Sequence, residues 1–427
     1  MTETTRRPRI SHVPRSAREA AFRLITAVLI EGRMLFEADG VLEGLAPPDR
    51  ARAQRLANDT LRHLARADHV LAAYLGKVPP APVLAVLRLA TVEICLGGDA
   101  HGVVNEAVAL VAAMKIGGTY KGLANAVLRR VATDGPAIWD IAPPAYLPDW
   151  LRGPLVAAWG GAAVRGIEAA IITPPPIDLT AKGDPAELAL AVGGTLLPTG
   201  SVRLDPGAQV SALPGYAEGA FWVQDAAAAL PARLLAPQPG ERVLDLCAAP
   251  GGKTMQLAAM GADVTALDLS GPRMRRVTEN LTRTGLSAQV IVGDALTHQG
   301  QYDAVLLDAP CSATGTLRRH PDLPHVRQAD AIADLIALQA RMLDHALTLL
   351  VPGGRLVFCT CSLLPDEGEA QVAAALTRHP GLRVLPADIS GVESVWHSPT
   401  GGLRLRPDHW ADRGGIDGFF MIALQNG

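Results

Sequence analysis

Two cysteines stand where a buried sheet would present reactive groups. Cys311 comes shortly after the apolar run at 304–307, and Cys361 comes shortly after the run at 356–358. Each run is typical of a buried strand, so we expect both thiols at the carboxyl ends of strands, where open α/β sheets place their chemistry. A cysteine in such a position is a candidate nucleophile.

A glycine turn upstream predicts a cofactor site that belongs with these thiols. Residues 243–254 supply a strand, the turn Gly251-Gly252 and a helix start, whose backbone N–H groups can bind a carboxylate or a phosphate. An ATP-binding loop is not favoured, because Cys247 stands where that pattern needs its first glycine. The Ala-Pro-Gly-Gly arrangement suits adenosylmethionine, which offers ribose hydroxyls and an amino acid tail but no pyrophosphate.

Acidic residues occur at or near the ends of four successive predicted strands. They are Asp245, Asp268, Asp294 and Asp308. An acid about 20 residues beyond a glycine turn can accept hydrogen bonds from ribose hydroxyls, which favours Asp268 for that contact. Each acid taken singly is as typical of a helix cap or a turn. The set of four favours a shared ligand.

The elements that must position these groups are readable as alternating strands and helices. Apolar runs predict strands at 243–246, 264–268, 289–292, 304–307, 355–358 and 419–423. Helical signals between them, notably 273–284 and 331–350, make parallel βαβ units the expected arrangement.

The N-terminal part of the chain has a different pattern. From residue 16 to about 133, apolar residues return every three to four positions, which predicts an all-α module. Gly135-Pro136 followed by Pro143-Pro144 marks its expected exit. Residues from about 145 to 235 predict a small α/β connector that opens with a helix at about 150–159.

Composition limits the class of protein. A chain of 427 residues predicts two or three domains. No apolar run reaches the roughly 18 residues that a bilayer requires, and the first residues lack a secretory signal, so we expect a cytoplasmic protein. The five cysteines are expected to be reduced thiols. Since Cys359 and Cys361 are too close in sequence for a zinc pair, no metal site is expected.

Nucleic acid would have to bind local basic patches, because the net charge of the chain is −3. Each patch alone is typical of a solvated face. For the segment 318–322 two interpretations stay open, a contact with RNA phosphate and a loop that leads to the next helix. The patches are Arg6, Arg7, Arg9, Arg15 and Arg18, then Arg129-Arg130, then Arg273 with Arg275 and Arg276, and Arg318-Arg319.

Three motifs occur together in the C-terminal half of the chain. They are Leu246-Cys247-Ala248-Ala249-Pro250-Gly251-Gly252-Lys253-Thr254, Asp308-Ala309-Pro310-Cys311-Ser312 and Thr360-Cys361-Ser362. Their combination closely resembles the RNA (cytosine-5) methyltransferases of the Fmu/Sun type. The segments 86–90, 103–108 and 121–130 look like a NusB-type RNA-binding helical domain. The fusion is similar to the one found in bacterial small-subunit ribosomal RNA methyltransferases.

The resemblance implies a fold class and its domain limits. We expect an α/β protein whose C-terminal Rossmann-type, adenosylmethionine-dependent methyltransferase domain is preceded by an all-α NusB-like domain and a small α/β connector. The expected limits are 1–15 for a basic tail, 16–135 for the NusB-like domain, 145–235 for the connector and 236–427 for the methyltransferase domain.

The resemblance also implies roles for individual residues. It assigns the attack on carbon 6 of cytosine to Cys361, product release to Cys311, and protonation of the ring nitrogen to Asp308, with Lys253 as a further catalytic group. DNA cytosine-5 methyltransferases use the Pro-Cys thiol as nucleophile, so Cys311 stays open as the attacker. The expected cofactor contacts are Cys247, Ala248, Ala249, Pro250, Gly251, Gly252, Lys253, Asp268, Arg273, Asp294, Asp308 and Pro310.

The implied function is methylation of carbon 5 of one cytosine in small-subunit ribosomal RNA, through a covalent thiolate adduct, by a monomer that uses S-adenosyl-L-methionine. Two alternatives stay open. One is the same reaction on another RNA, such as tRNA. The other is a non-catalytic RNA-binding factor for ribosome assembly, which the presence of Cys311, Cys361 and Asp308 disfavours.

Overall fold

The computed structural model describes residues 13–426, which form two compact units. Within the described residues, the first unit contains residues 13–148 together with His320–Arg327, and the second contains Asp149–Arg319 and residues 328–426. Among residues 13–426, no helix combines the length and apolar character that crossing a membrane requires. The basic residues Arg6, Arg7 and Arg9 lie outside the described residues.

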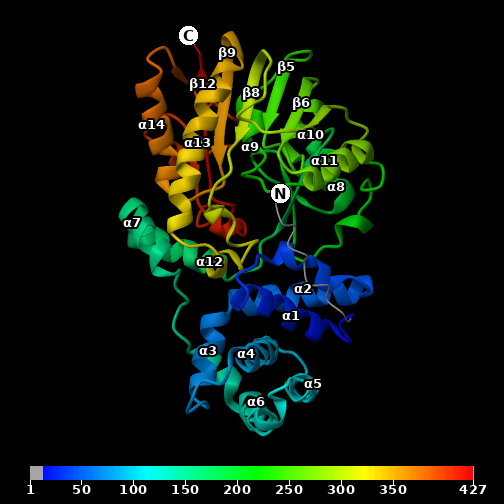
Figure 1. The fold of residues 1–427 in the computed structure, drawn as a ribbon. Helices are drawn as coiled ribbons and strands as arrows, with labels where there is room; N and C mark the ends of the chain where they lie inside the picture. The colour runs from blue at the N-terminus through cyan, green and yellow to red at the C-terminus, as the bar shows by residue number, and fades with distance from the viewer. Residues whose placement is uncertain (1–12, 427) are drawn as a thin grey trace, which may run out of the picture. The chain divides into compact units, whose positions relative to one another are not determined.

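The first unit is all helical, as its period of three to four residues predicts (Figure 1). Apolar faces of these helices meet in two adjoining cores, one centred on Val86, Leu87 and Leu128 and the other on Leu24 and Ile25. The helices are α1 (Ala17–Leu29), α2 (Pro47–Arg62), α3 (Leu64–Ala72), α4 (Ala81–Cys95), α5 (Ala100–Ala112) and α6 (Gly117–Asp140). The unit also contains the 3-10 segment η1 (Leu35–Leu42) and, from a later part of the chain, the short α12 (Leu323–Val326).

Helix α6 ends between the two predicted exit signals of this module, Gly135-Pro136 and Pro143-Pro144. Helix α6 continues through Pro136 as far as Asp140, where buried Trp139 packs into the core. Proline removes a backbone donor and usually ends a helix. Here the packing of Trp139 outweighs that local preference.

The second unit opens with α7 (Asp149–Ile171), which is longer than the predicted helix and kinks at Gly160, where φ is +79°. A four-stranded antiparallel sheet follows, in the order β2-β3-β1-β4, with α8 (Pro185–Val192) packed on it. Its strands are β1 (Ile177–Ala181), β2 (Thr195–Leu196), β3 (Val202–Leu204) and β4 (Phe221–Val223). This small α/β module is the predicted connector.

The main sheet confirms the Rossmann-type prediction. Its order is β10-β12-β9-β8-β5-β6-β7, with β11 also paired to β12. Strands β5 to β9 are parallel, whereas β12 runs antiparallel between β9 on one side and β10 and β11 on the other. The strands are β5 (Arg242–Leu246), β6 (Asp263–Asp268), β7 (Gln289–Val292), β8 (Tyr302–Asp308), β9 (Leu350–Thr360), β10 (Arg383–Leu385), β11 (Leu403–Leu405) and β12 (Phe419–Gln425).

Helices cover both faces of this sheet (Figure 1). On one face, α13 (Asp330–Thr348) and α14 (Glu369–Arg378) pack on side chains such as Val305 and Phe358. On the other face lie α9 (Leu230–Leu235), α10 (Gly252–Ala259) and α11 (Gly271–Thr284). Because both faces are buried, the central strands read as continuous apolar runs. The polar groups described next lie at or just beyond the carboxyl ends of β5, β6, β8 and β9.

Candidate active site

The two predicted thiols lie side by side. Cys311 follows β8 and Cys361 follows β9, and because these strands are parallel neighbours their ends meet. The sulfur atoms of Cys311 and Cys361 are 3.4 Å apart, close enough for one thiol to donate a hydrogen bond to the other. This hydrogen bond, with burial, raises the pKa of Cys311 well above its ordinary value. Cys311 is therefore a protonated thiol at neutral pH.

Backbone contacts hold the two cysteine loops together. The N–H group of Gly315 donates to the carbonyl of Cys361 at 2.8 Å, and the N–H group of Gly418 donates to the carbonyl of Gly315 at 2.8 Å. A Cβ atom at Gly315 would lie 1.9 Å from the carbonyl oxygen of Gly418. Only glycine permits this close approach of three segments.

An ion pair lies at the adjacent strand end. The Lys253 ammonium, from the first turn of α10, is 2.8 Å from a carboxylate oxygen of Asp308 at the end of β8. Burial alone would lower the pKa of Lys253, but the Asp308 carboxylate raises it above the ordinary value, so this lysine stays charged. The Cys359 sulfur is 3.5 Å from the other Asp308 oxygen. Burial raises the pKa of Cys359 well above its ordinary value, so this thiol stays protonated.

The predicted cofactor turn connects β5 to α10. Its backbone takes left-handed conformations at Cys247, with φ of +62°, and at Gly251, with φ of +104°, and the Ala249-Pro250 peptide bond is cis. A side chain at Gly251 would be strained by that φ and would press on Val277 of α11. Glycine at this position therefore allows the turn to pack closely against α11.

Asp268, at the end of β6, is joined to this turn. Its buried carboxylate accepts hydrogen bonds from the N–H groups of Ala249 at 3.3 Å and Ser270 at 2.9 Å. The Arg273 guanidinium donates to the Ala249 carbonyl and lies 3.7 Å from the Asp268 carboxylate. Asp268 therefore orders the turn itself, and a carboxylate retains further lone pairs for a ligand.

Asp245 supplies a buried acceptor beside the turn. One of its oxygens accepts a hydrogen bond from the Thr254 hydroxyl at 2.6 Å, and the other has no hydrogen-bond partner among residues 13–426. Burial raises the pKa of Asp245 to about 7. An acceptor without a partner, a backbone turn of this shape and Asp268 fit the amino group and the ribose of adenosylmethionine.

Two predicted cofactor residues lie apart from these contacts. Asp294 follows β7 and is exposed, and its carboxylate accepts the N–H group of Leu296 at 2.9 Å, which is a local turn. Pro310 precedes Cys311, and its carbonyl accepts a hydrogen bond from the Gln339 side chain at 2.8 Å. No described contact joins Asp294 to the other predicted site residues, so its role stays a prediction.

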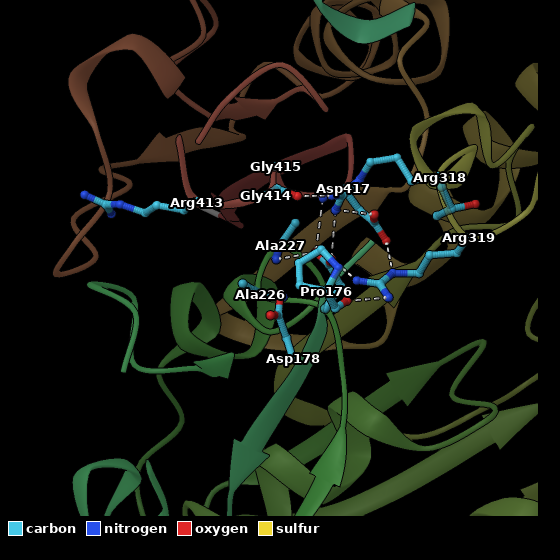
Figure 2. Close-up of polar contacts among 12 residues, drawn as sticks. Pro176, Asp178, Ala226, Ala227, Arg318, Arg319, Arg413, Gly414, Gly415 and Asp417 are labelled. Atoms are coloured by element: carbon cyan, nitrogen blue, oxygen red, sulfur yellow. Dashed lines mark hydrogen bonds and ion pairs between the residues drawn. The ribbon is translucent and has the colours of Figure 1, made fainter. Parts of the chain in front are cut away.

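Of the two interpretations of segment 318–322, the structure supports the structural one. The guanidinium groups of Arg318 and Arg319 form ion pairs with Asp225 and Asp417 at 2.6 to 3.5 Å, and Figure 2 shows them turned toward Asp417. Arg318 is only 1% exposed, so it has no surface to offer to a phosphate. Burial alone would raise the pKa of Asp225, but Arg319 and Arg318 together lower it below the ordinary value.

The same cluster joins the connector to the methyltransferase sheet. Arg203 of β3 forms a bidentate ion pair with Asp178 of β1 and donates to the carbonyls of Arg413 and Gly415 at 2.8 Å. The ion pairs of Arg318 and Arg319 with Asp417 connect the loop that carries Cys311 to the loop before β12. Arg18, another predicted patch residue, pairs with Glu93 and Glu106 inside the helical unit.

The sequence interpretation missed a buried polar cluster beneath the thiols. Ser312 and Ser362, which directly follow the two cysteines, both donate hydrogen bonds to the carboxylate of Glu367. The motifs Pro-Cys-Ser and Thr-Cys-Ser pointed to the serines, but nothing in the sequence around Glu367 distinguishes it from a surface acid.

Comparisons with known proteins agree with this geometry. Residues 232–425 match a sequence model described as 16S rRNA methyltransferase RsmB/F, and residues 15–133 match the NusB family. The protein named ribosomal RNA small subunit methyltransferase B of Sodalis glossinidius is 36% identical over 413 residues, which cover 88% of this chain and 95% of that protein. Its counterpart in Xanthomonas campestris pv. campestris is 38% identical over 434 residues, 96% of this chain and 97% of that protein.

Solved structures show the same fold. The crystal structure of PH0851 covers 95% of this chain and 98% of its own, with a TM-score of 0.71 at 23% identity. A methyltransferase homologue from Pyrococcus horikoshii covers 65% of this chain and 94% of its own, with a TM-score of 0.55 at 26% identity.

Proposed function

Because this chain belongs to the ribosomal RNA small subunit methyltransferase B family, we propose that it methylates carbon 5 of one cytosine in small-subunit ribosomal RNA. It is a methyltransferase whose methyl donor is S-adenosyl-L-methionine. The observation that carries the finer proposal is the pair of thiols, 3.4 Å apart, at the ends of β8 and β9. Two adjacent thiols suit a reaction that must both form and break a bond between the enzyme and the base.

The proposed nucleophile is Cys361. Its thiolate adds to carbon 6 of cytosine, which makes carbon 5 electron-rich enough to take up a methyl group. Bound adenosylmethionine supplies that methyl group as an electrophile. Solvent water takes up the carbon 5 proton, and the electron pair of that C–H bond re-forms the ring double bond as the Cys361 thiolate leaves. The ring nitrogen then returns its proton to the Asp308–Lys253 pair. The raised pKa of Cys311 supports this order, because a protonated Cys311 can donate its hydrogen to the Cys361 sulfur and is itself a poor attacker.

Asp308 and Lys253 are the proposed acid pair. Addition at carbon 6 is favoured when the ring nitrogen next to the exocyclic amine gains a proton. Asp308 is proposed to bind that nitrogen and relay the proton to it. The proton is supplied by the Lys253 ammonium, 2.8 Å away, which becomes a neutral amine as the base gains the proton.

The proposed cofactor cradle is the turn 247–253 together with Asp268. Asp245 would accept the amino group of the cofactor, Asp268 its ribose hydroxyls, and the backbone at Gly251 and Gly252 its carboxylate. Arg273, Asp294 and Pro310 are proposed as outer contacts. The helical part of the chain is proposed to bind RNA within the limits 16–135, and the enzyme is expected to act as a cytoplasmic monomer.

A methylation assay tests the proposal. Purified protein and labelled adenosylmethionine are incubated with small-subunit ribosomal RNA and, separately, with tRNA, and modified cytosines are mapped. Methylation at one ribosomal cytosine supports the proposal, and methylation confined to tRNA favours the alternative substrate. Absence of any methylation would favour the non-catalytic assembly factor.

The variants Cys361→Ala and Cys311→Ala separate the two thiols. We expect Cys311→Ala to accumulate a covalent protein–RNA adduct on denaturing gels and Cys361→Ala to form none. The reverse pattern would assign the attack to Cys311, as in DNA cytosine-5 methyltransferases.

A further inference from the structure

Glu367 is a fully buried carboxylate that touches both cysteine loops. It ends the 3-10 segment η4 (Pro365–Glu367), which follows Cys361, and none of its surface is exposed. Among the ion pairs of residues 13–426 none includes Glu367. A charged group taken out of water without a counter-ion is costly unless hydrogen bonds replace its hydration.

Those hydrogen bonds come from the residues that follow the two reactive cysteines. One oxygen of Glu367 accepts the Ser312 N–H group at 2.8 Å and the Gln339 side-chain amide at 3.0 Å. The other accepts the hydroxyls of Ser312 and of Ser362, the latter at 2.6 Å. Hydrogen bonds to an ionised carboxylate are about twice as strong as those between neutral groups. One carboxylate therefore fixes Ser312 and Ser362 relative to each other.

Further contacts make this cluster rigid. The Thr314 hydroxyl is 3.2 Å from both serine hydroxyls and accepts the N–H group of Leu363 at 2.9 Å. The Gln339 amide that donates to Glu367 also donates to the carbonyl of Pro310, the residue before Cys311. Cys311 is thus held by contacts made by its two neighbours in the chain, both of which lead to Glu367.

We propose that Glu367 is the positioning residue of the two-thiol site: its carboxylate sets the separation of the Cys311 and Cys361 sulfurs. This inference rests on the function proposed above, in which the two thiols act in sequence on one base. A loop bearing a nucleophile has to hold it to within a fraction of an ångström, and a misplacement of about 1 Å can lower a rate about 10²-fold. The hydrogen bond to Cys361 and burial are the main causes of the raised pKa of Cys311, and the charge of Glu367 acts in the same direction.

The test compares Glu367→Gln with Glu367→Asp and with the control Asp366→Asn, which alters the exposed acid next to it in η4. The glutamine side chain has one accepting oxygen in place of the two oxygens of the carboxylate. One serine hydroxyl or the Ser312 N–H group therefore loses its hydrogen-bond acceptor. Aspartate keeps the carboxylate charge on a shorter side chain. Ser312→Ala and Ser362→Ala each remove one hydroxyl donor while keeping Glu367, and they serve if the glutamine variant does not fold.

The first readout is the separation of the thiols in the protein without RNA. Diamide takes two electrons and two protons from the Cys311 and Cys361 thiols, which leaves a disulfide and the reduced hydrazine, and peptide mass spectrometry follows the cross-linked product. We expect Glu367→Gln to slow this cross-link at least about tenfold, Glu367→Asp to restore part of the rate, and Asp366→Asn to match the wild type. An unchanged rate in a folded Glu367→Gln variant would overturn the inference.

The second readout is the reaction itself. We expect Glu367→Gln to lower kcat about 10²-fold with KM for RNA and for adenosylmethionine nearly unchanged, because the lost contacts lie beneath the thiols and not in the cofactor turn. A loss of thermal stability with wild-type kcat would show a merely structural role and overturn the inference. If the wild type methylates no RNA, the proposed function fails, and the cross-linking rates still decide the role of Glu367.

Discussion

Lys253 and Asp308 form an ion pair, 2.8 Å between nitrogen and oxygen, that joins the helix after β5 to the end of β8. Lys253 follows Gly252 of the predicted cofactor turn, and Asp308 precedes Cys311 by three positions in the chain. The ion pair therefore links the predicted cofactor turn to the strand end that leads to Cys311.

Lys253→Met should therefore impair catalysis. Methionine keeps the length of the side chain but leaves Asp308 without its cation, and loss of a general acid–base group costs about 10²- to 10⁴-fold in rate. We expect kcat to fall by that factor while RNA binding, measured by filter retention, stays within about twofold. Lys182→Met, which removes the lysine that donates to the Thr284 carbonyl, is the matched control. Equal activities of the two variants would contradict the role of Lys253.

Asp245 should make the protein less stable as the pH rises. Its pKa is raised to about 7 in the folded protein, against about 3.9 for an unfolded aspartate, so the folded state binds more protons between these values. The free energy of unfolding then falls from about pH 4 to pH 7, by up to about 4 kcal/mol. Asp245→Asn removes this dependence, and urea unfolding should show the variant more stable than the wild type at pH 8.

The same comparison at pH 4 provides the control. There Asp245 is protonated in both states of the wild type for much of the time, so the advantage of the asparagine variant should nearly vanish. The exposed Asp294→Asn should change stability equally little at both pH values. A gap between Asp245→Asn and the wild type that is the same at pH 4 and pH 8 would show that the effect has another origin.

Asp225→Asn should strongly destabilise the fold. The change leaves the buried guanidinium of Arg318 and its neighbour Arg319 with one carboxylate, Asp417, in place of two. Breaking a buried ion pair from one side costs about 3–5 kcal/mol. Asp412→Asn breaks an exposed contact with Arg413 instead and should change stability by less than about 1 kcal/mol. Chemical denaturation measures both, and similar values for the two variants would refute this account.

Gly315→Ala should displace the Cys311 loop. The new Cβ would meet the Gly418 carbonyl at 1.9 Å, so backbone must move, at a cost of about 1–3 kcal/mol. Methylation should fall more than tenfold, since Gly315 also donates to the Cys361 carbonyl. Gly381→Ala, where a Cβ meets nothing within 4 Å, should leave activity and unfolding unchanged. Wild-type activity of Gly315→Ala would show that the loops tolerate a wider separation.

The strands at the centre of the main sheet were predictable because strands that are buried on both faces have nearly continuous apolar sequences. The prediction at 243–246 agrees with β5 to within one residue, and that at 264–268 agrees with β6 to within one residue. The short edge strands β10 and β11 were missed. Three residues paired to one partner strand carry too little periodicity to stand out from a loop.

Cys311 could be named as a site candidate from the sequence, because it is a rare residue type that follows a strand. Glu367 and Asp225 could not, because a buried acid and a surface acid look alike until the fold brings their partners together. The buried role of the basic residue Arg318 was not predictable from the sequence either. Its position next to Arg319 suggests a phosphate contact, whereas its acidic partner Asp417 lies far along the chain.

The position of β12 within the sheet has a consequence for the order in which the protein is made. This strand comes last in chain order, yet it lies inside the sheet and pairs with β9, β10 and β11. Asp417 and Gly418, just before it, complete the contacts of Arg318 and Gly315 in the Cys311 loop. During synthesis on the ribosome, the loop that carries Cys311 therefore gains these contacts only after residues 417–425 have emerged. A shorter nascent chain contains both cysteines but lacks the contacts that hold this loop in place.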